Sequence, residues 1–194
     1  MKLLHLDASA LGSHSVSRGL TAAIVAELTA NNPGTEVIYH DLVASPLAHW
    51  TPVADASDPA AVLGSQMIEE FLAADVIVIG APMYNFSIPS QLKAWIDRVA
   101  VAGKTFQYTA NGPQGLAGGK RVIIASSRGG VYSAGSAAAP MDFQETYLRA
   151  VFGFLGITDI EFVRAEGVNL GEDNKVASLK TAHASIGEVA RKAA

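Results

Sequence analysis

The sequence predicts a single doubly wound α/β domain over residues 1–194, a three-layer sandwich with helices on both faces of a five-stranded parallel sheet. One observation is that five short strand-like runs alternate with five helical patterns along the chain. Another is that three of these runs are apolar throughout, which is typical of strands buried on both faces. The other two runs mix apolar and polar residues, as edge strands do. With right-handed crossovers, the strand order is expected to be 2-1-3-4-5.

The first predicted strand is the apolar run at 3–6, and a serine-rich loop at 8–19 leaves its carboxyl end. A helix is expected to begin near Ser15 and to end at a Pro-Gly stop signal. The second strand, 36–41, is less uniformly apolar, so we place it at an edge. The connection at 43–59 has three prolines and little periodicity, and a loop of this length in a compact domain is usually functional or mobile.

The central strand is the unbroken apolar run at 76–79, which is expected to stop at 80–82. A loop at 83–86 leads to a helix whose first turn accommodates Pro89, because a missing N–H costs nothing there. The remaining expected elements are a helix at 60–73, a glycine-rich excursion at 103–120 with the character of a hairpin, a fourth strand at 121–126, a helix at 142–155, a mixed fifth strand at 160–164 and a final helix at 174–192.

The amino-acid composition argues against several classes of function. Charged residues make up only 16% of the chain, against roughly 25% in an average soluble domain, so we expect a second copy to cover part of the surface. The net charge of −4 includes no acidic or basic tract, which argues against nucleic-acid and anionic-membrane partners. The absence of cysteine excludes disulfides, thiolate nucleophiles and Fe–S clusters. No signal peptide or apolar run of ~20 residues is present, so a cytoplasmic location is expected.

The first strand–loop–helix junction predicts a phosphate site. A helix N-terminus attracts anions through its free N–H groups, and hydroxyls at Ser9, Ser15 and Ser17 add further donors. The loop lacks the motifs for a dinucleotide pyrophosphate or a nucleotide triphosphate, which leaves a single monophosphate held by neutral donors. The alternative is an ordinary N-cap with extra serines, and the loop alone does not decide between the two.

Two further loops, 83–86 and 127–130, leave neighbouring strands at the same sheet edge. The first supplies apolar surface and one amide, and the second supplies glycines that allow close approach, a combination that suits a planar heterocycle. A flexible glycine loop without a ligand is the alternative, but three converging loops favour a site. A monophosphate joined to a flat ring with polar edges describes FMN.

Other chemistries find little support. The five histidines show no metal-ligand spacing, although His14 lies in the predicted phosphate loop. Asp7, at the end of the first strand, is interpreted as structural because the chain lacks the other residues of a phospho-acceptor domain. A serine-hydrolase G-x-S-x-G motif does not occur.

The sequence resembles the FMN-dependent NADH-azoreductases, which are flavodoxin-like NAD(P)H:quinone and azo oxidoreductases. The shared motifs are S-x5-S-x-S ending at Ser17, APMYNF, QLKAWID, TFQYT-x-NGP-x-GL, SRGG and GFLGITD…EG, and they span most of the chain in the family's order. The resemblance implies a flavodoxin-like fold, noncovalent FMN, NADH or NADPH as electron donor, quinones and azo compounds as acceptors, and a homodimer. Segments 43–66 and 131–141 depart from the family pattern and bear on substrate preference.

The resemblance also implies roles for individual residues. The FMN phosphate is expected to bind at Ser9, Ser15, Val16 and Ser17. The isoalloxazine ring is expected to contact Pro82, Met83, Tyr84, Asn85, Phe86, Ser127, Arg128, Gly129 and Gly130. The substrate cavity is expected to contain Tyr108, Tyr132 and Phe154, with Phe154 supplied by the partner subunit. No obligatory protein acid or base is assigned, because the flavin carries the chemistry.

Two other functions remain as alternatives: a flavodoxin-like one-electron carrier and a non-catalytic flavin-binding regulatory protein. A carrier should present an acidic docking face, and the sparse, mixed charge of this chain argues against one.

Overall fold

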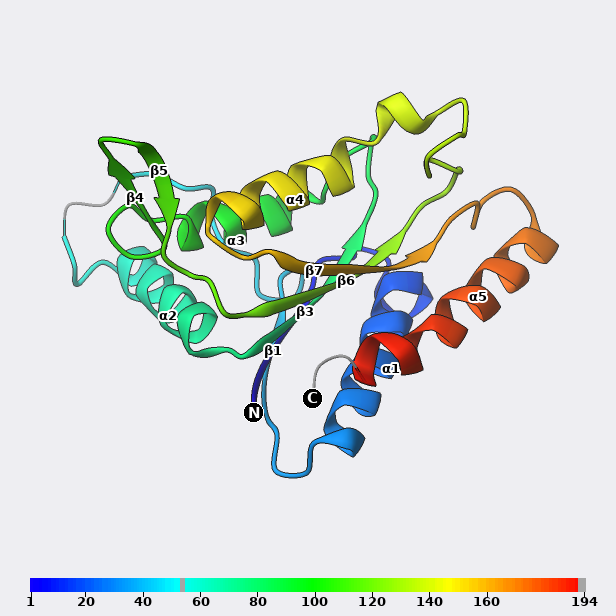
Figure 1. The fold of residues 1–194 in the computed structure, drawn as a ribbon, viewed down its shortest axis with the longest axis horizontal. Coiled ribbons are helices and arrows are strands. Elements are labelled where there is room, and N and C mark those ends of the chain that lie inside the picture. Colours follow the sequence, from blue (N-terminus) through cyan, green and yellow to red (C-terminus); the bar gives the residue numbers. More distant parts are fainter. Residues whose placement is uncertain (53–54, 192–194) are drawn as a thin grey trace.

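The computed structural model describes residues 1–52 and 55–191 and contains a five-stranded parallel sheet of order β2-β1-β3-β6-β7 (Figure 1). These strands are β1 Lys2–Asp7, β2 Glu36–Asp41, β3 Val76–Pro82, β6 Arg121–Ser127 and β7 Asp159–Ala165. The predicted excursion is an antiparallel hairpin of β4, Phe106–Thr109, and β5, Gly112–Gly115. The runs predicted as the fourth and fifth sheet strands are therefore β6 and β7.

Helices cover both faces of the sheet, as expected (Figure 1). One face carries α1, Val16–Asn31, and α5, Glu172–Arg191; the other carries α2, Pro59–Ala73, α3, Ser90–Val99, and α4, Phe143–Phe154. Two short 3₁₀ helices, Gly12–His14 and Ala139–Met141, lie in the loops that precede α1 and α4. The final helix was expected to reach residue 192, which lies outside the described residues, as do residues 53–54 of the long connection.

Alternation along β3 divides the core into two clusters. Ile77 and Ile79 pack in the cluster that includes Trp95 of α3, whereas Val76 and Val78 pack in the cluster that includes Leu20 of α1. Successive side chains of a strand point to opposite faces, so an unbroken apolar run serves both layers. All seven residues of β3 are buried, which confirms the central position expected for this run.

The edge positions of β2 and β7 are also confirmed. Val37 and Tyr39 of β2 are exposed, and only part of the strand packs against the core. Polar residues tolerate such positions because one side of an edge strand faces water or loops.

The boundary between β3 and α3 differs from the prediction. The strand runs through Pro82 because 80–82 continue to pair with 125–127 of β6, and Met83 N then donates to Ser127 O at 2.8 Å. Pro89 is the N-cap of α3 and not its first helical residue. The connection between the strand and the helix is therefore 83–89, and its first residue is held by a hydrogen bond to the end of β6.

Candidate functional site

The carboxyl ends of β1, β3 and β6 meet at one edge of the sheet, where Asp7 is opposite Gly80 and Pro82 is opposite Ser127. A cavity of ≈ 130 Å³ opens at this edge. Its lining residues are Ser9, Leu11, His14, Ser15, Val16, Ser127, Val168, Asn169 and Lys175. The structure thus brings four of the predicted cofactor residues together and adds a segment after β7 that sequence reasoning missed.

The β1–α1 loop presents a row of hydroxyl groups at the start of α1. Ser15 is the N-cap, and its Oγ accepts from Arg18 N at 3.2 Å. Its Oγ also lies 3.2 Å from Oγ of Ser17, which is fully buried in the first turn. Ser9 Oγ accepts from Leu11 N at 3.3 Å. The serines therefore form a compact polar cradle at the positive end of a sixteen-residue helix.

Arg18 fixes the backbone of this cradle. Its Nη2 donates to Ser9 O at 2.9 Å, and the guanidinium forms a bidentate pair with Asp41, with both N–O distances 2.7 Å. The hydrogen bonds from Arg18 lower the pKa of Asp41 to about 2, and the same pair raises the pKa of Arg18. Because charge-assisted bidentate pairs are strong and directional, the position of Ser9 is set by β2 as well as by its own loop. Nothing in the local sequence marks Arg18 for this role.

Asp7, which the sequence analysis interprets as structural, is buried at the end of β1. Thr21 Oγ1 donates to Asp7 Oδ1 at 2.9 Å and Tyr39 Oη donates to Oδ2 at 3.2 Å. Burial alone raises the pKa of Asp7, but its neighbours, His5 foremost, outweigh burial and hold the pKa below its usual value. A Cβ at position 80 would lie 2.5 Å from Asp7 Oδ1, so only glycine fits there.

The loop after β3 is a tight two-residue turn. Tyr84 and Ser87 exchange two backbone hydrogen bonds of 2.9 and 3.0 Å, and the residues between them have positive φ, 48° at Asn85 and 71° at Phe86. Two consecutive positive φ values define a type I′ turn, which Asn tolerates and a bulky aromatic residue does not favour. Phe86 is nevertheless held there, with its carbonyl accepting from Phe143 N at 3.1 Å. Such local strain is typical of functional loops.

Hydrogen bonds tie the three predicted loops together. Tyr84 Oη accepts from Ala10 N at 3.0 Å, which links the loop after β3 to the loop after β1. The bond from Met83 N to Ser127 O links it to the end of β6. The ring of Tyr132 lies 6.2 Å from that of Phe86 in an edge-to-face arrangement. The residues expected to surround a planar ligand therefore form one connected structure.

Gly129 and Gly130 connect this structure to the segment after β7. Their carbonyl oxygens accept from Asn169 N at 3.2 Å and from Gly167 N at 2.9 Å. A Cβ at position 129 would lie 2.7 Å from Asn169 Nδ2, so glycine allows the Asn169 side chain to approach the loop closely. The sequence signals for the segment were that it follows a strand ending at the same sheet edge and that it begins with the EG of the shared GFLGITD…EG motif.

Arg128 differs from its glycine neighbours because its side chain is buried, with 1% exposure. It pairs with Asp142 at 3.0 Å, Glu145 at 2.6 Å and Glu166 at 3.1 Å, and its Nε donates to Gln144 Oε1 at 3.0 Å. These partners use its donors within the protein. We therefore expect Arg128 to hold the loop in position and not to contact the ring through its guanidinium.

Of the predicted substrate residues, Tyr132 lies beside the loop after β3, whereas Tyr108 and Phe154 lie away from it within one chain. Tyr108 is 75% exposed on the hairpin, and the rings of Tyr108 and Phe154 both contact Phe106. Phe154 ends α4, whereas Phe143, which bonds to Phe86, begins it. Eleven residues at about 1.5 Å each separate the two ends by roughly 16 Å. Figure 1 shows the hairpin and the β3–α3 loop at opposite ends of α4.

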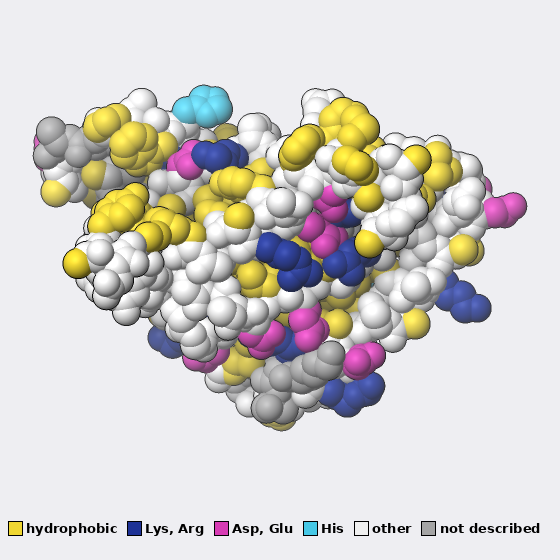
Figure 2. All heavy atoms as spheres, turned by 45° about the horizontal axis from the view of Figure 1, so that its top comes forward, with side chains coloured by type: hydrophobic (Ala, Val, Ile, Leu, Met, Phe, Trp, Pro, Cys, Tyr) yellow, Lys and Arg dark blue, Asp and Glu magenta, His cyan; other side chains and the backbone are white. Residues whose placement is uncertain are grey.

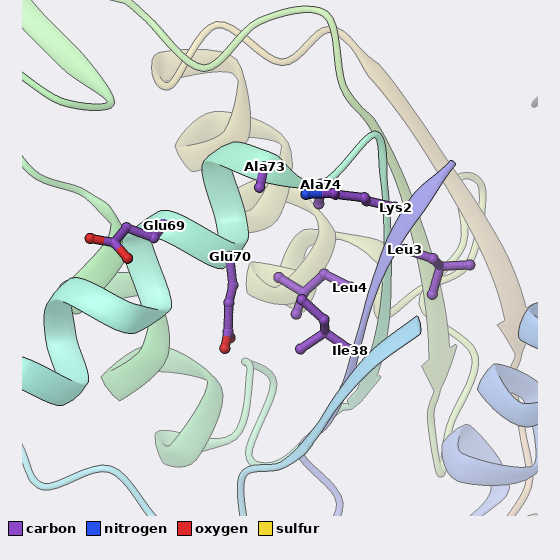
Figure 3. A pocket seen from close by; sticks show the side chains of 8 residues that line it. All are labelled: Lys2, Leu3, Leu4, Ile38, Glu69, Glu70, Ala73 and Ala74. Carbon is purple, nitrogen blue, oxygen red and sulfur yellow. The ribbon is translucent and has the colours of Figure 1, made fainter. Parts of the chain in front are cut away.

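A separate pocket of ≈ 200 Å³ near the amino end of β1 is shown in Figure 3. The pocket is lined by residues of β1, β2 and α2 and by the residue that follows α2. These residues are Lys2, Leu3, Leu4, Ile38, Glu69, Glu70, Ala73 and Ala74. It lies away from the converging loops and shares no residue with them. Within residues 1–52 and 55–191, no cluster of three metal-ligating side chains occurs, and no helix is long and apolar enough to cross a membrane.

Comparison with known proteins identifies the family. A family model described as a flavodoxin-like fold matches residues 1–190. A relative from Sinorhizobium fredii, named FMN-dependent NADH:quinone oxidoreductase, is 62% identical, with 97% of this chain and 96% of the relative covered. The chain belongs to this family. Another member, from Rhizobium meliloti and with the same name, is 59% identical over the same shares of the two chains.

Solved structures with the same architecture include an azoreductase from Bacillus anthracis, with a TM-score of 0.90, 29% identity and 99% of each chain covered. The azoreductase AzrA has a TM-score of 0.89 and 30% identity, with 99% of this chain and 100% of AzrA covered. The flavodoxin-like fold predicted from the sequence is thus confirmed by the family model, which matches residues 1–190, and by these structures.

The donor set fits the cofactor in the family's name. Oγ groups of Ser15 and Ser17 and the free N–H groups of α1 suit a single phosphate. Lys175, in the first turn of α5, lines the same cavity and adds a cation to donors that the sequence analysis took as neutral. The strained Phe86 supplies exposed apolar surface in the loop after β3.

A pair of substitutions at Phe86 tests the strain in the turn. Phe86→Gly and Phe86→Val both remove the ring, but only glycine adopts a φ of 71° without strain. We expect the free energy of unfolding of the glycine variant to exceed that of the valine variant by about 1–2 kcal/mol. Urea unfolding of the apoproteins measures the difference. Equal stability would show that the turn relaxes and stores no strain.

Proposed function

We propose that this protein is an FMN-dependent NAD(P)H oxidoreductase that reduces quinones and azo compounds. The observation that carries the proposal is the hydrogen-bonded convergence of the loops after β1, β3 and β6, with Tyr84 bonded to Ala10 and Met83 to Ser127. The family relationship supports the same conclusion. When bound, FMN accepts two electrons from a nicotinamide donor and passes them to an acceptor.

In this proposal the chain binds and orients the cofactor and excludes water from one face of it. Ser9, Ser15, Val16, Ser17 and the N-terminus of α1 hold the phosphate. The segments 82–86 and 127–130 lie along the ring, Gly129 and Gly130 through their backbone and Arg128 as the support of that backbone. The whole chain, residues 1–194, forms one FMN-binding domain that functions in the cytoplasm.

The surroundings of the site favour small apolar acceptors over a protein redox partner. Phe86, Val131, Met141 and Phe143 are all exposed near the loops after β3 and β6. A one-electron carrier needs an acidic docking face. A regulatory protein does not need exposed apolar side chains beside the ring. Planar aromatic substrates such as quinones match this surface.

We also propose a homodimer in which Tyr108 and Phe154 of one subunit complete the site of the other. Figure 2 looks onto the side of the molecule that is uppermost in Figure 1 and shows several groups of exposed hydrophobic side chains. The exposed Tyr108, Leu116 and Phe143 belong to the hairpin, the chain just after it and α4. A stable interface of about 1,600 Å² would cover surface of this kind.

Light scattering of the FMN-loaded protein at micromolar concentration is expected to give twice the mass of one chain. Tyr108→Glu places a charge in the proposed interface, so we expect it to weaken dimerisation and to lower quinone turnover together. Lys93→Glu, in an exposed pair with Asp97 on α3, serves as a charge-changing control. A monomer with full activity would refute the dimeric site.

Turnover is expected to be ping-pong, because one open ring face beside Phe86 and Tyr132 has room for either the nicotinamide or the acceptor. Electron transfer by hydride requires reacting atoms about 3–3.5 Å apart, which direct stacking provides. Initial rates with varied quinone at several fixed NADH concentrations should give parallel double-reciprocal lines. Intersecting lines would show a ternary complex, and no NADH-dependent quinone reduction would refute the enzymatic function itself.

A further inference from the structure

A second cavity, of ≈ 460 Å³, lies between the connection after β2, the first three turns of α2 and the carboxyl end of α3. The lining residues that matter here are His49, Trp50, Ile68, Arg98, Val101 and Lys104. Arg98 lies eight residues along α3 from its start at Ser90, or roughly 12 Å from the helix end next to the flavin loops. The cavity is therefore separate from the converging loops of the same chain.

Arg98 is the unusual feature of this cavity. Its side chain is buried, with 7% exposure, and Nη1 donates to Ala94 O at 3.2 Å. A guanidinium has five N–H donors, and no carboxylate pairs with this one anywhere in the part of the chain that the structure describes. The buried Arg121 and Arg128 each have carboxylate partners. A buried charge without a counter-ion is costly, so this position favours an incoming anion.

The rest of the cavity has the same electrostatic sign. Lys104 lines it and carries a positive charge, and Ala60 and Ala61 line it at the N-terminus of α2, where the helix dipole is positive. The nearby Asp58 carboxylate is the N-cap of α2 and accepts from Ala60 N at 2.7 Å. None of the described residues that line the cavity is acidic. A cationic cavity in a chain of net charge −4 is a local feature and not the consequence of composition.

Apolar surface completes the site. Trp50 is 55% exposed, and Ile68 and Val101 line the cavity beside it. The volume lies in the range of about 300–1,000 Å³ that is typical of small-molecule pockets. We propose that this cavity binds a planar aromatic carboxylate or sulfonate, with the anionic group on Arg98 and Lys104 and the ring against the Trp50 indole. Arg suits this role because its planar donors match such oxyanions bidentately.

The test uses two probes that differ in charge and little in shape: naphthalene-2-sulfonate and the neutral naphthalene-2-sulfonamide. Calorimetric titration of the FMN-loaded protein is expected to show at least about tenfold tighter binding of the sulfonate, because charge-assisted hydrogen bonds require the anion. The flavin absorbance spectrum should not change, which places the probe away from the ring. Tighter binding of the sulfonamide, or no binding of either probe, would overturn the proposal.

Substitutions assign the binding to this cavity. Arg98→Gln is expected to weaken sulfonate binding at least about tenfold and to leave sulfonamide binding unchanged, whereas Arg98→Lys retains part of the preference. Because Arg98 is buried, the exposed Lys104→Gln provides a second variant that does not disturb α3, with an expected loss of about threefold. Circular dichroism and FMN content verify folding. Sulfonate affinity that is the same in wild type, Arg98→Gln and Lys104→Gln would refute the site.

Discussion

Ser17→Asp is expected to abolish FMN binding at micromolar concentration while the domain remains folded. Ser17 is fully buried in the first turn of α1, with its Oγ 3.2 Å from that of Ser15. A carboxylate there would face the phosphate dianion, and each pair of unit charges 4 Å apart costs about 4 kcal/mol at an effective dielectric of 20. We expect the affinity for FMN to fall by at least about a thousandfold, the effect of one such pair, measured by fluorescence titration of the apoprotein.

Ser17→Asn is the matched control, because asparagine has the shape of aspartate without its charge. We expect it to weaken FMN binding by tenfold at most, since it replaces one hydrogen-bonding group by another. Both variants should fold, because Asp and Asn are tolerated in the first turn of a helix. If the aspartate variant bound FMN as tightly as the asparagine variant, the phosphate would not lie in the β1–α1 loop.

Arg128→Met is expected to lower the free energy of unfolding by about 3–5 kcal/mol. The substitution leaves Asp142 and Glu166 without the cation that they share and removes one of two arginines from Glu145. Methionine fills a similar volume, so the loss reports the uncompensated carboxylates and not a cavity. Because Arg128 also positions Gly129 and Gly130, FMN affinity should fall as well. Urea unfolding of the apoprotein separates the two effects.

Arg164→Met provides the comparison. Arg164 donates to the same Glu145 through two hydrogen bonds of 2.6 and 2.7 Å, but its side chain is 40% exposed. Glu145 keeps Arg128 in this variant, and solvent screens the remaining charge, so the expected loss is less than about 1 kcal/mol. If both arginine variants lost the same free energy of unfolding, burial would not explain the contribution of Arg128 to stability.

Hydrophobic pattern alone determined the sheet and its exposed edges. The apolar run at 76–79 and the mixed run at 36–41 were placed correctly at the centre and the edge, because burial on both faces requires apolar residues at every position. The same pattern brought Ser9, Ser15 and Ser127 to one edge, since parallel strands end on the same side. These features depend on which short runs are apolar throughout and which are mixed, so they can be predicted without a structure.

Only the tertiary structure decided how the loops are held. Three of these contacts join residues that are far apart along the chain or on different elements. They are the hydrogen bond from Arg18 to Ser9 O, the pairing of Arg128 with three carboxylates, and the placement of Lys175 at the cavity. The left-handed φ of Phe86 likewise exists because distant atoms hold an unfavourable conformation. Each depends on side-chain directions and on the register between strands and loops. The hydrophobic pattern of the sequence does not specify these contacts, because the residues that contact each other are brought together only when the chain folds.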